Sequence, residues 1–265
     1  MTHPPRPPIP LVAFDEAAAA ARRRELAPAR LGRLADLGAW LAGCAGTSHP
    51  PVRARLAAAA RPAEGDPGIA APAGLEVGEV AAAVDAGRAL AARAAADGIT
   101  VLAGDAGGRE ASVPAICVAG ALTGAPPARL AAPDSAVGEA VAAALDRQAE
   151  QARGPLGVLR RLGDAGLAVL TGLAVGAGET GLAYVCDGLV ATAGAAVAVA
   201  VEPGLRPRLI AGHRSGEPAH DVVLEHLGLD PVLDLGVRTG DGTGAMLAIE
   251  VLRVAAGLRD PRGAG

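Results

Sequence analysis

Residues 182–192 read LAYVCDGLVAT: a short apolar run, then Asp187 and Gly188, then the start of a second apolar run. Strands of a parallel sheet are buried on both faces and read as short continuous apolar runs, so 182–186 is expected to be a strand. The residues after Gly188 favour a helix that begins where the strand ends. A strand that passes through a tight turn into a helix is the repeating unit of α/β folds.

The same order of strand, loop and helix recurs along the chain. Further apolar runs that are expected to be strands stand at 99–103 (ITVLA), 207–211 (PRLIA) and 231–235 (PVLDL). Helices are expected around them, near 78–97, near 110–123, after Glu217 and from about 243 to 258. The sequence therefore predicts an α/β fold, a three-layer α/β/α arrangement with a mainly parallel sheet.

A small helical lobe is expected to precede this core. Two Ala-rich segments, about 15–27 and 31–44, predict helices, and the second carries Leu31, Leu34 and Leu37 at helical spacing. Proline and glycine mark the expected boundaries. The expected organisation is a disordered Pro-rich tail at 1–14, an N-terminal helical segment at 15–60, a linker at 61–75 and an α/β core domain at 76–265.

Composition limits the classes of function. The chain is 51% hydrophobic and 20% charged, contains no Lys and no Asn, and has a net charge of −4. Its core is therefore expected to consist of small aliphatic side chains packed at short distances. No basic stripe interleaved with aromatic residues is present, so no nucleic-acid partner is expected. The run Arg22–Arg24 is interpreted as a solvated helix face.

The remaining sequence-wide features favour a cytoplasmic protein. Cys44, Cys117 and Cys186 are far apart in apolar segments and are expected to be buried, reduced thiols. No signal peptide is expected, because acidic residues interrupt the first apolar stretch. No membrane span is expected either, since the longest apolar stretch, 188–201, is shorter than the roughly 18 residues that a spanning helix needs.

The loops that follow the predicted strands are expected to meet at one edge of the sheet, where α/β proteins bind ligands. The strongest local signal is LDLGVRTGDGTGAMLAIEVL at 233–252. Its glycines allow tight turns, the helix after them offers N–H groups to an anion, and Asp241 could accept a proton. The alternative interpretation, helix capping by a connecting loop, stays equally open. Neither a dinucleotide fingerprint nor a P-loop fits, because the glycine spacing differs and the chain lacks Lys.

Three other loops carry polar side chains. In VLAGDAGGREAS (101–112), Asp105 follows a strand, and Arg109 could pair with a phosphate or lie solvated beside Glu110. CDGLVAT (186–192) places Asp187 at the end of a strand. IAGHRSGEPAH (210–220) offers backbone donors and an Arg. Its histidines and Glu217 lack the second Glu-x-x-His copy of a two-metal site, so no metal and no cofactor are expected.

Taken together, these loops resemble the nicotinate-nucleotide–dimethylbenzimidazole phosphoribosyltransferase family. The segments that carry the resemblance, in order and spacing, are LGRLADLGAWLAG (31–43), GDAGGREASVPAICVAGALTG (104–124), VCDGLVATAGAAVAV (185–199), LIAGHRSGEPAH (209–220) and LGLDPVLDLGVRTGDGTGAMLAI (227–249). The resemblance implies transfer of phosphoribose from nicotinate mononucleotide to 5,6-dimethylbenzimidazole, or to a related aromatic base. It also implies a homodimer, or a heterodimer with a full-length homologue.

The resemblance implies a role for each residue of the loops. The carboxylate in the last glycine loop, Asp241, is the expected base, and Asp105 is the second catalytic residue. The expected substrate contacts are Gly104, Gly107, Gly108, Ser112, Asp187, Gly212, His213, Arg214, Ser215, Gly240, Gly242, Thr243 and Gly244.

The chain departs from the family pattern at four places. Asp241 and Asp105 stand where the family has Glu, an Asn–Thr pair is missing from the central loop, and residues 130–140 contain no counterpart of the phosphate-binding basic residue. Several dozen residues between His49 and Leu75 are also missing. These departures leave two further hypotheses open: a non-catalytic paralogue that binds nucleotide or partners a full-length transferase, and an unrelated nucleotide-binding α/β protein.

Overall fold

The computed structural model describes residues 9–27, 31–58, 74–105, 113–148 and 153–259. A four-stranded parallel sheet lies at its centre, in the order β1 (Ala54–Ala58), β2 (Val101–Asp105), β3 (Ala183–Cys186) and β4 (Leu209–Ala211). The helices before β3 are α1 (Glu16–Leu26), α2 (Arg33–Ala45), α3 (Val77–Ala96), α4 (Val113–Thr123), α5 (Pro127–Leu130), α6 (Ala136–Gln148), α7 (Gly154–Leu162) and α8 (Ala165–Thr180). After β3 come α9 (Gly188–Val201), the 3₁₀ helix η3 (Pro203–Arg208), α10 (Pro218–Leu227) and α11 (Thr243–Gly257).

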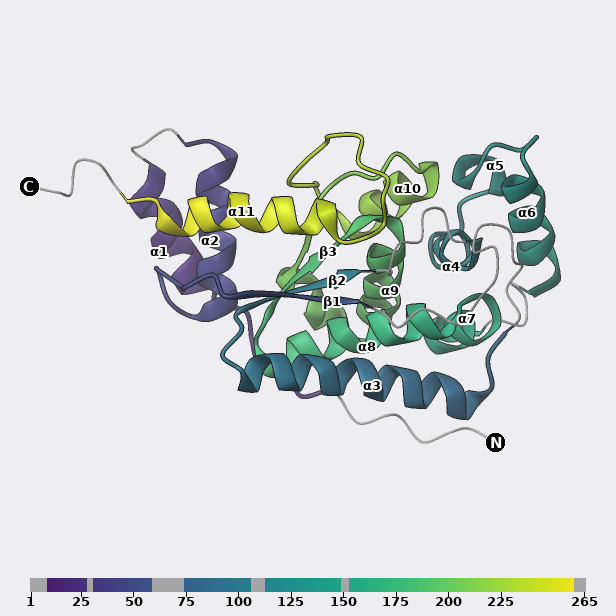
Figure 1. The fold of residues 1–265 in the computed structure, drawn as a ribbon, viewed down its shortest axis with the longest axis horizontal. Coiled ribbons are helices and arrows are strands. Elements are labelled where there is room, and N and C mark those ends of the chain that lie inside the picture. Colours follow the sequence, from purple (N-terminus) through teal and green to yellow (C-terminus); the bar gives the residue numbers. More distant parts are fainter. Residues whose placement is uncertain (1–8, 28–30, 59–73, 106–112, 149–152, 260–265) are drawn as a thin grey trace, which may run out of the picture.

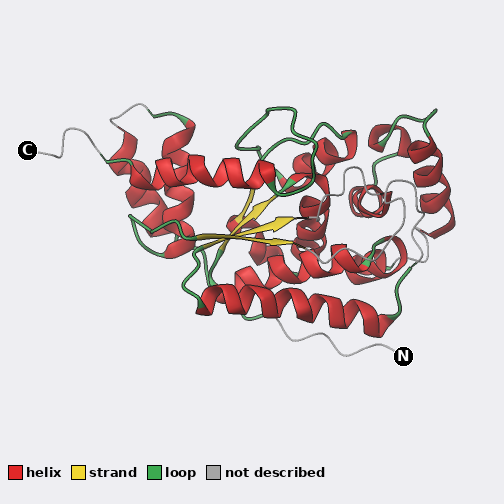
Figure 2. Ribbon diagram, in the orientation of Figure 1, coloured by secondary structure: helices red, strands yellow, loops and turns green. Residues whose placement is uncertain are grey.

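Helices cover both faces of this sheet (Figures 1 and 2). Alternate residues of each strand point to opposite faces, so the sheet separates two apolar clusters. Leu102 and Tyr184 face the larger cluster, which includes α4, α8 and α9. Val101 and Val185 face the smaller one, with α2 and α11. The predicted α/β/α arrangement with a parallel sheet is therefore confirmed.

Two strand predictions are wrong. Residues 231–235 form no strand: Leu233 makes a single parallel bridge with His213, two residues after Pro231, which has no N–H to donate. Conversely, β1 lies inside the segment predicted to be helical over 15–60. Its sequence, ARLAA, has little of the β-branched and aromatic character that strands favour. The division of the chain into a lobe, a linker and a core stays a prediction.

The N-terminal segment corrects the predicted tail in part. Within the expected disordered stretch 1–14, residues 9–14 lie against the core: the N–H of Val12 donates to the carbonyl of Gly178 (3.0 Å). The buried guanidinium of Arg208 donates to the carbonyls of Val12 (2.9 Å) and Ala13 (2.8 Å). Residues 1–8 lie outside the described part of the chain.

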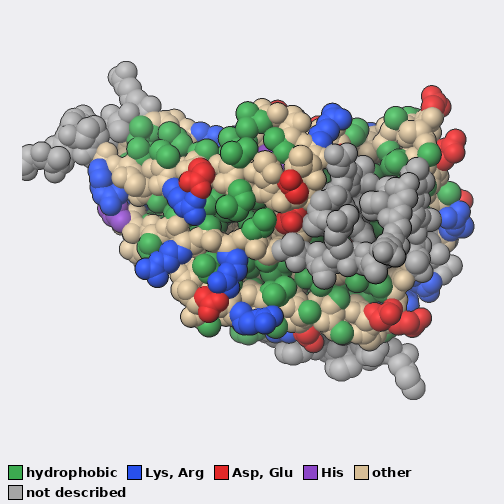
Figure 3. All heavy atoms as spheres, viewed as in Figure 1, with side chains coloured by type: hydrophobic (Ala, Val, Ile, Leu, Met, Phe, Trp, Pro, Cys, Tyr) green, Lys and Arg blue, Asp and Glu red, His purple; other side chains and the backbone are tan. Residues whose placement is uncertain are grey.

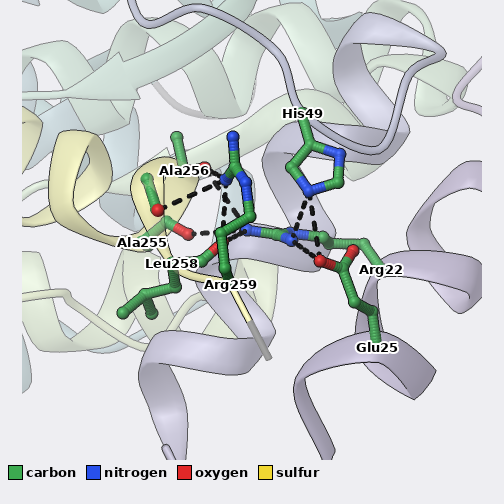
Figure 4. A network of polar contacts seen from close by, with 8 residues as sticks. Arg22, Glu25, His49, Ala255, Ala256, Leu258 and Arg259 are labelled. Carbon is green, nitrogen blue, oxygen red and sulfur yellow. Dashed lines mark hydrogen bonds and ion pairs between the residues drawn. The ribbon is translucent and has the colours of Figure 1, made fainter. Parts of the chain in front are cut away.

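The C-terminal end of α11 is tied to α1 by Arg22 (Figure 4). Its Nη2 donates to the last carbonyls of that helix and just beyond it, those of Ala255 (3.4 Å), Ala256 (3.3 Å) and Leu258 (2.6 Å). Its Nη1 lies 2.8 Å from Oε1 of Glu25. The carbonyls of a final helical turn lack intrahelical partners and form the negative end of the helix dipole, so a cation is stabilising there. The predicted solvated face is wrong for Arg22, which is fully buried.

The predicted core of small side chains is confirmed where α3 crosses α8. A β-carbon on Gly172 would overlap the carbonyl oxygen of Val84, and one on Gly87 would overlap that of Val169. The two helices therefore approach backbone to backbone. At the same contact, the guanidinium of Arg88 binds both carboxylate oxygens of Glu179, at 2.7 and 3.0 Å.

The face shown in Figure 3 carries charges of both signs, and the three cysteine thiols are buried. On the face shown in Figure 3, acidic and Arg side chains are scattered among apolar ones. Within the described residues, no helix is both long and apolar enough to cross a membrane. Cys44, Cys117 and Cys186 are buried and free, as predicted, and burial raises the pKa of each thiol to about 12.

Gly172→Ala should lower the free energy of unfolding by about 1–3 kcal/mol, because the added methyl group forces α3 and α8 apart. Gly78→Ala, in the first turn of α3 with open space around it, is the matched control and should be neutral or stabilising by up to about 1 kcal/mol. Urea denaturation of both variants measures the difference. Equal stability of the two variants would contradict the close packing.

Candidate functional site

The carboxyl ends of the four strands form one edge, as the order of the loops predicts. The strand ends are in register, with Ala58 beside Asp105 and Gly104 beside Cys186. The loop before α11 crosses this edge. It begins beside β4, where Leu233 bridges His213, and reaches β1, where a β-carbon on Gly242 would overlap the side chain of Leu56. The glycine loop therefore lies over the ends of the strands.

The buried side chain of Asp187 holds this loop in place. Its Oδ1 accepts a hydrogen bond from the N–H of Ala245 (2.8 Å), and its Oδ2 accepts one from the N–H of Gly242 (3.2 Å). The same carboxylate lies 3.4 Å from Nδ1 of His213, which is also buried. A carboxylate at a helix N-terminus satisfies unpaired N–H groups and interacts favourably with the helix dipole. Asp187 thus connects the end of β3 to the start of α11.

Several glycines predicted to bind substrate have packing roles in the structure. A β-carbon on Gly244 would overlap the ring of His213, and one on Gly212 would lie 3.0 Å from Cα of Ala245. Gly104 likewise leaves room for the hydroxyl of Tyr184. These positions need glycine because neighbouring elements approach closely there. Their predicted contacts with substrate stay predictions.

Asp241, the predicted base, lies exposed at the tip of the loop. Its Oδ1 accepts hydrogen bonds from Oγ1 of Thr239 (2.6 Å) and from the N–H of Thr243 (3.0 Å). These bonds, with that of Thr239 as the largest cause, lower the pKa of Asp241 to about 2. The carboxylate is therefore ionised at neutral pH and accepts the N–H of Thr243, the first residue of α11, whose N-cap residue is Gly242.

A buried hydrogen-bond chain supports the loop after β4. The N–H of Ser215 (3.1 Å) and its Oγ (2.7 Å) lie against Nδ1 of His220, and Nε2 of that ring lies 3.1 Å from Oγ1 of Thr192. A backbone N–H can only donate, so Nδ1 accepts and the proton sits on Nε2. Burial, followed by the charges of His213 and Arg214, lowers the pKa of His220 to about 3. This neutral ring fixes Ser215 beside the strand ends.

The other predicted site residues are placed as follows. Asp105 is buried at the carboxyl end of β2, directly after Gly104, whose carbonyl accepts a hydrogen bond from the N–H of Asp187 (3.2 Å) at the end of β3. Arg214 lies 3.3 Å from a carboxylate oxygen of Asp221 and 3.5 Å from one of Asp234. Gly240 adopts a left-handed conformation (φ 55°) beside Asp241. Gly107, Gly108, Ser112 and Arg109 lie outside the described residues.

The structure also brings residues to this edge that the sequence analysis did not select. Leu56 lies at this edge because it belongs to β1, a strand that the sequence pattern did not predict. Thr239 and Arg238 belong to the quoted glycine loop, and a threonine two residues before an aspartate is a signal for a side-chain turn. Within the described residues, no group of three or more His, Cys, Asp or Glu side chains is arranged to hold a metal ion.

His220 should make the protein less stable in mild acid. Its folded-state pKa of about 3 lies below its unfolded value of 6.5, so below pH 6.5 only the unfolded state takes up the proton. The free energy of unfolding should fall by up to about 1.4 kcal/mol per pH unit between pH 6 and pH 4. Urea titrations should show a smaller loss for His220→Gln than for the wild type. His226→Gln, at an exposed position of the same helix, should keep the wild-type slope. An unchanged slope in His220→Gln would contradict this assignment.

Known proteins share both the sequence and the fold. The phosphoribosyltransferase family model DBI_PRT matches residues 60–260. The nicotinate-nucleotide–dimethylbenzimidazole phosphoribosyltransferase of Thermus thermophilus is 42% identical over 186 residues, which are 67% of this chain and 55% of that protein. The protein of the same name from Mycobacterium bovis is 39% identical over 186 residues, covering 67% and 51% of the two chains. The chain thus spans about half the length of the curated relatives it matches.

A solved structure extends the likeness to nearly the whole fold. The crystal structure of a Thermus thermophilus protein of this name superimposes with a TM-score of 0.79 at 30% identity, covering 92% of this chain and 95% of that one. The family model covers well over half of the chain and includes the four loops after Leu75 from which the site was built. This chain therefore belongs to the DBI_PRT phosphoribosyltransferase family.

Proposed function

We propose that the chain transfers phosphoribose from nicotinate mononucleotide to 5,6-dimethylbenzimidazole or a related aromatic base, giving nicotinate and α-ribazole 5′-phosphate. The observation that carries the proposal is the ionised carboxylate of Asp241, held at the tip of a loop over the strand ends. The family membership and the names of the relatives support the choice of substrates.

The proposed reaction needs one aimed base. One ring nitrogen of the benzimidazole attacks C1′ of the ribose with inversion, and the bond between C1′ and the nicotinate nitrogen breaks, with its electron pair returning to the pyridinium ring. The proton on the other ring nitrogen passes to Asp241. A low pKa makes Asp241 a weak base, but this N–H becomes more acidic as the ring gains positive charge. Positioning of the two reactants supplies the rest of the acceleration.

A second candidate function is that of a non-catalytic paralogue that binds nucleotide or pairs with a full-length transferase. The observation that favours it is that Asp241 is already hydrogen-bonded to Thr239 and Thr243, and its pKa of about 2 is far below the range near neutrality that suits a general base. Both candidates are compatible with a dimer in the cytoplasm, which stays a prediction.

Asp241→Ala should reduce formation of α-ribazole phosphate by about 10²- to 10⁴-fold, because the benzimidazole proton loses its acceptor. The assay uses the purified protein, nicotinate mononucleotide and 5,6-dimethylbenzimidazole, with product measured by chromatography. Asp230→Asn is the control, since Asp230 is an exposed carboxylate that pairs with Arg33. A fully active Asp241→Ala variant would refute the base assignment. No product from the wild type with any aromatic base would favour the second candidate.

Thr239→Val should raise the pKa of Asp241 from about 2 towards the ordinary carboxyl range, because it removes the strongest hydrogen bond that stabilises the ionised form. The acid limb of the pH–rate profile, or of a carbon-13 titration of the Asp241 carboxyl, should move upward by the same amount. Thr180→Val, which removes a hydroxyl bonded to the carbonyl of Gly176, is the control. An unmoved titration would show that Thr239 does not hold Asp241 in solution.

A further inference from the structure

The N–H groups of the glycine loop are largely used by the protein itself. Those of Gly242 and Ala245 donate to Asp187, and that of Thr243 donates to Asp241. These are the donors at the start of α11 that an anion at a helix N-terminus would use. A phosphate placed there would have to displace two carboxylates that the same helix end stabilises.

The loop after β4 offers little more to an anion. The N–H of Arg214 donates to the carbonyl of Leu233 (2.8 Å), and that of Ser215 donates to His220. The guanidinium of Arg214 already faces two carboxylates, those of Asp221 and Asp234. Its charge is therefore largely compensated before any substrate arrives.

Arg238 differs from Arg214 in its surroundings. It lies in the glycine loop, three residues before Asp241, and its guanidinium folds over the loop after β4. A β-carbon on Gly216 would lie 2.5 Å from Nη2 and 2.9 Å from Cζ, so the planar group rests directly on the glycine backbone. Within the described residues, no carboxylate oxygen is within ion-pair distance of this exposed guanidinium.

We propose that Arg238 binds the phosphate of the mononucleotide substrate. This inference rests on the proposed function and deepens it. The segment 130–140, where the resemblance places a phosphate-binding basic residue, contains no basic side chain in this chain, so another cation has to bind the phosphate. A guanidinium presents several N–H donors in one plane and binds phosphate oxygens in pairs, and such charged hydrogen bonds are the strong ones. The proposed position places anion binding and proton acceptance on one loop that Asp187 holds rigid.

Electrostatics also favour a cation at this position. Asp234 and Asp241 flank Arg238 in the loop, and Asp187 and Asp105 are buried at the same edge of the sheet. A doubly charged phosphate that approaches this edge is repelled by the carboxylates unless a cation receives it. Gly216 allows Arg238 to take this position, because any side chain at residue 216 would push the guanidinium off the loop.

The experiment measures binding by calorimetry to nicotinate mononucleotide, ribose 5-phosphate and the phosphate-free nicotinate riboside, together with KM and kcat. Arg238→Gln should weaken binding of the two phosphate compounds by about 10- to 100-fold and raise KM for the mononucleotide similarly. Its affinity for the riboside and its kcat should stay near the wild-type values. Arg238→Lys should lie between, and Arg253→Gln, at an exposed position of α11, should match the wild type.

Each outcome decides the inference. A variant Arg238→Gln that still prefers mononucleotide to riboside by the wild-type factor overturns it, whatever the wild type catalyses. Failure of the wild type to bind either phosphate compound also overturns it. If the wild type forms no product but binds ribose 5-phosphate through Arg238, the proposed function fails and the phosphate assignment stands. If the wild type forms product and Arg238→Gln keeps its KM, the reverse holds.

Discussion

The buried carboxylate of Asp187 is the constraint on which the edge of the sheet depends. It stands at the end of a central strand, with a side chain only 2% exposed, where an ionised group is stable only if donors surround it. The start of α11 supplies two N–H groups and the positive end of a helix dipole. The glycine loop cannot leave the strand ends without stripping Asp187 of these donors, so the position of the loop and the charge of Asp187 stabilise each other.

The glycines at this edge have a different role from the glycines of many phosphate-binding loops. In many phosphate-binding loops, glycine lets the backbone approach the ligand. Here Gly212 and Gly244 let neighbouring protein elements approach each other, and the N–H groups of Gly242 and Ala245 donate to Asp187. The loop therefore works as a rigid support, and the groups left to meet a substrate are side chains. This is the physical reason for proposing that Arg238 binds the anion and that Asp241 accepts the proton.

Much of this was accessible from the sequence, because short apolar runs followed by Asp or Gly report buried parallel strands directly. Strands β2, β3 and β4 and the shared edge were predicted for that reason. β1 was missed because Ala54–Ala58 gains its strand conformation from pairing with β2, which local propensity does not show. Arg22 was misplaced because its burial depends on carbonyls more than 230 residues away. The satisfied donors of the glycine loop, which decide its chemistry, are equally long-range.

The hydrogen bonds that fix the position of the Asp241 carboxylate also lower its basicity. Two hydrogen bonds to one oxygen fix the short aspartate side chain, and a fixed carboxylate is what a proton transfer within a bound complex needs. The same two bonds stabilise the ionised form and make the carboxylate a poorer base. A glutamate in this place would reach one methylene further, beyond the turn that Thr239 and Thr243 close, and would gain basicity while losing that restraint. The aspartate therefore suits a reaction in which the acceptor's proton becomes acidic during attack, so that aim matters more than proton affinity.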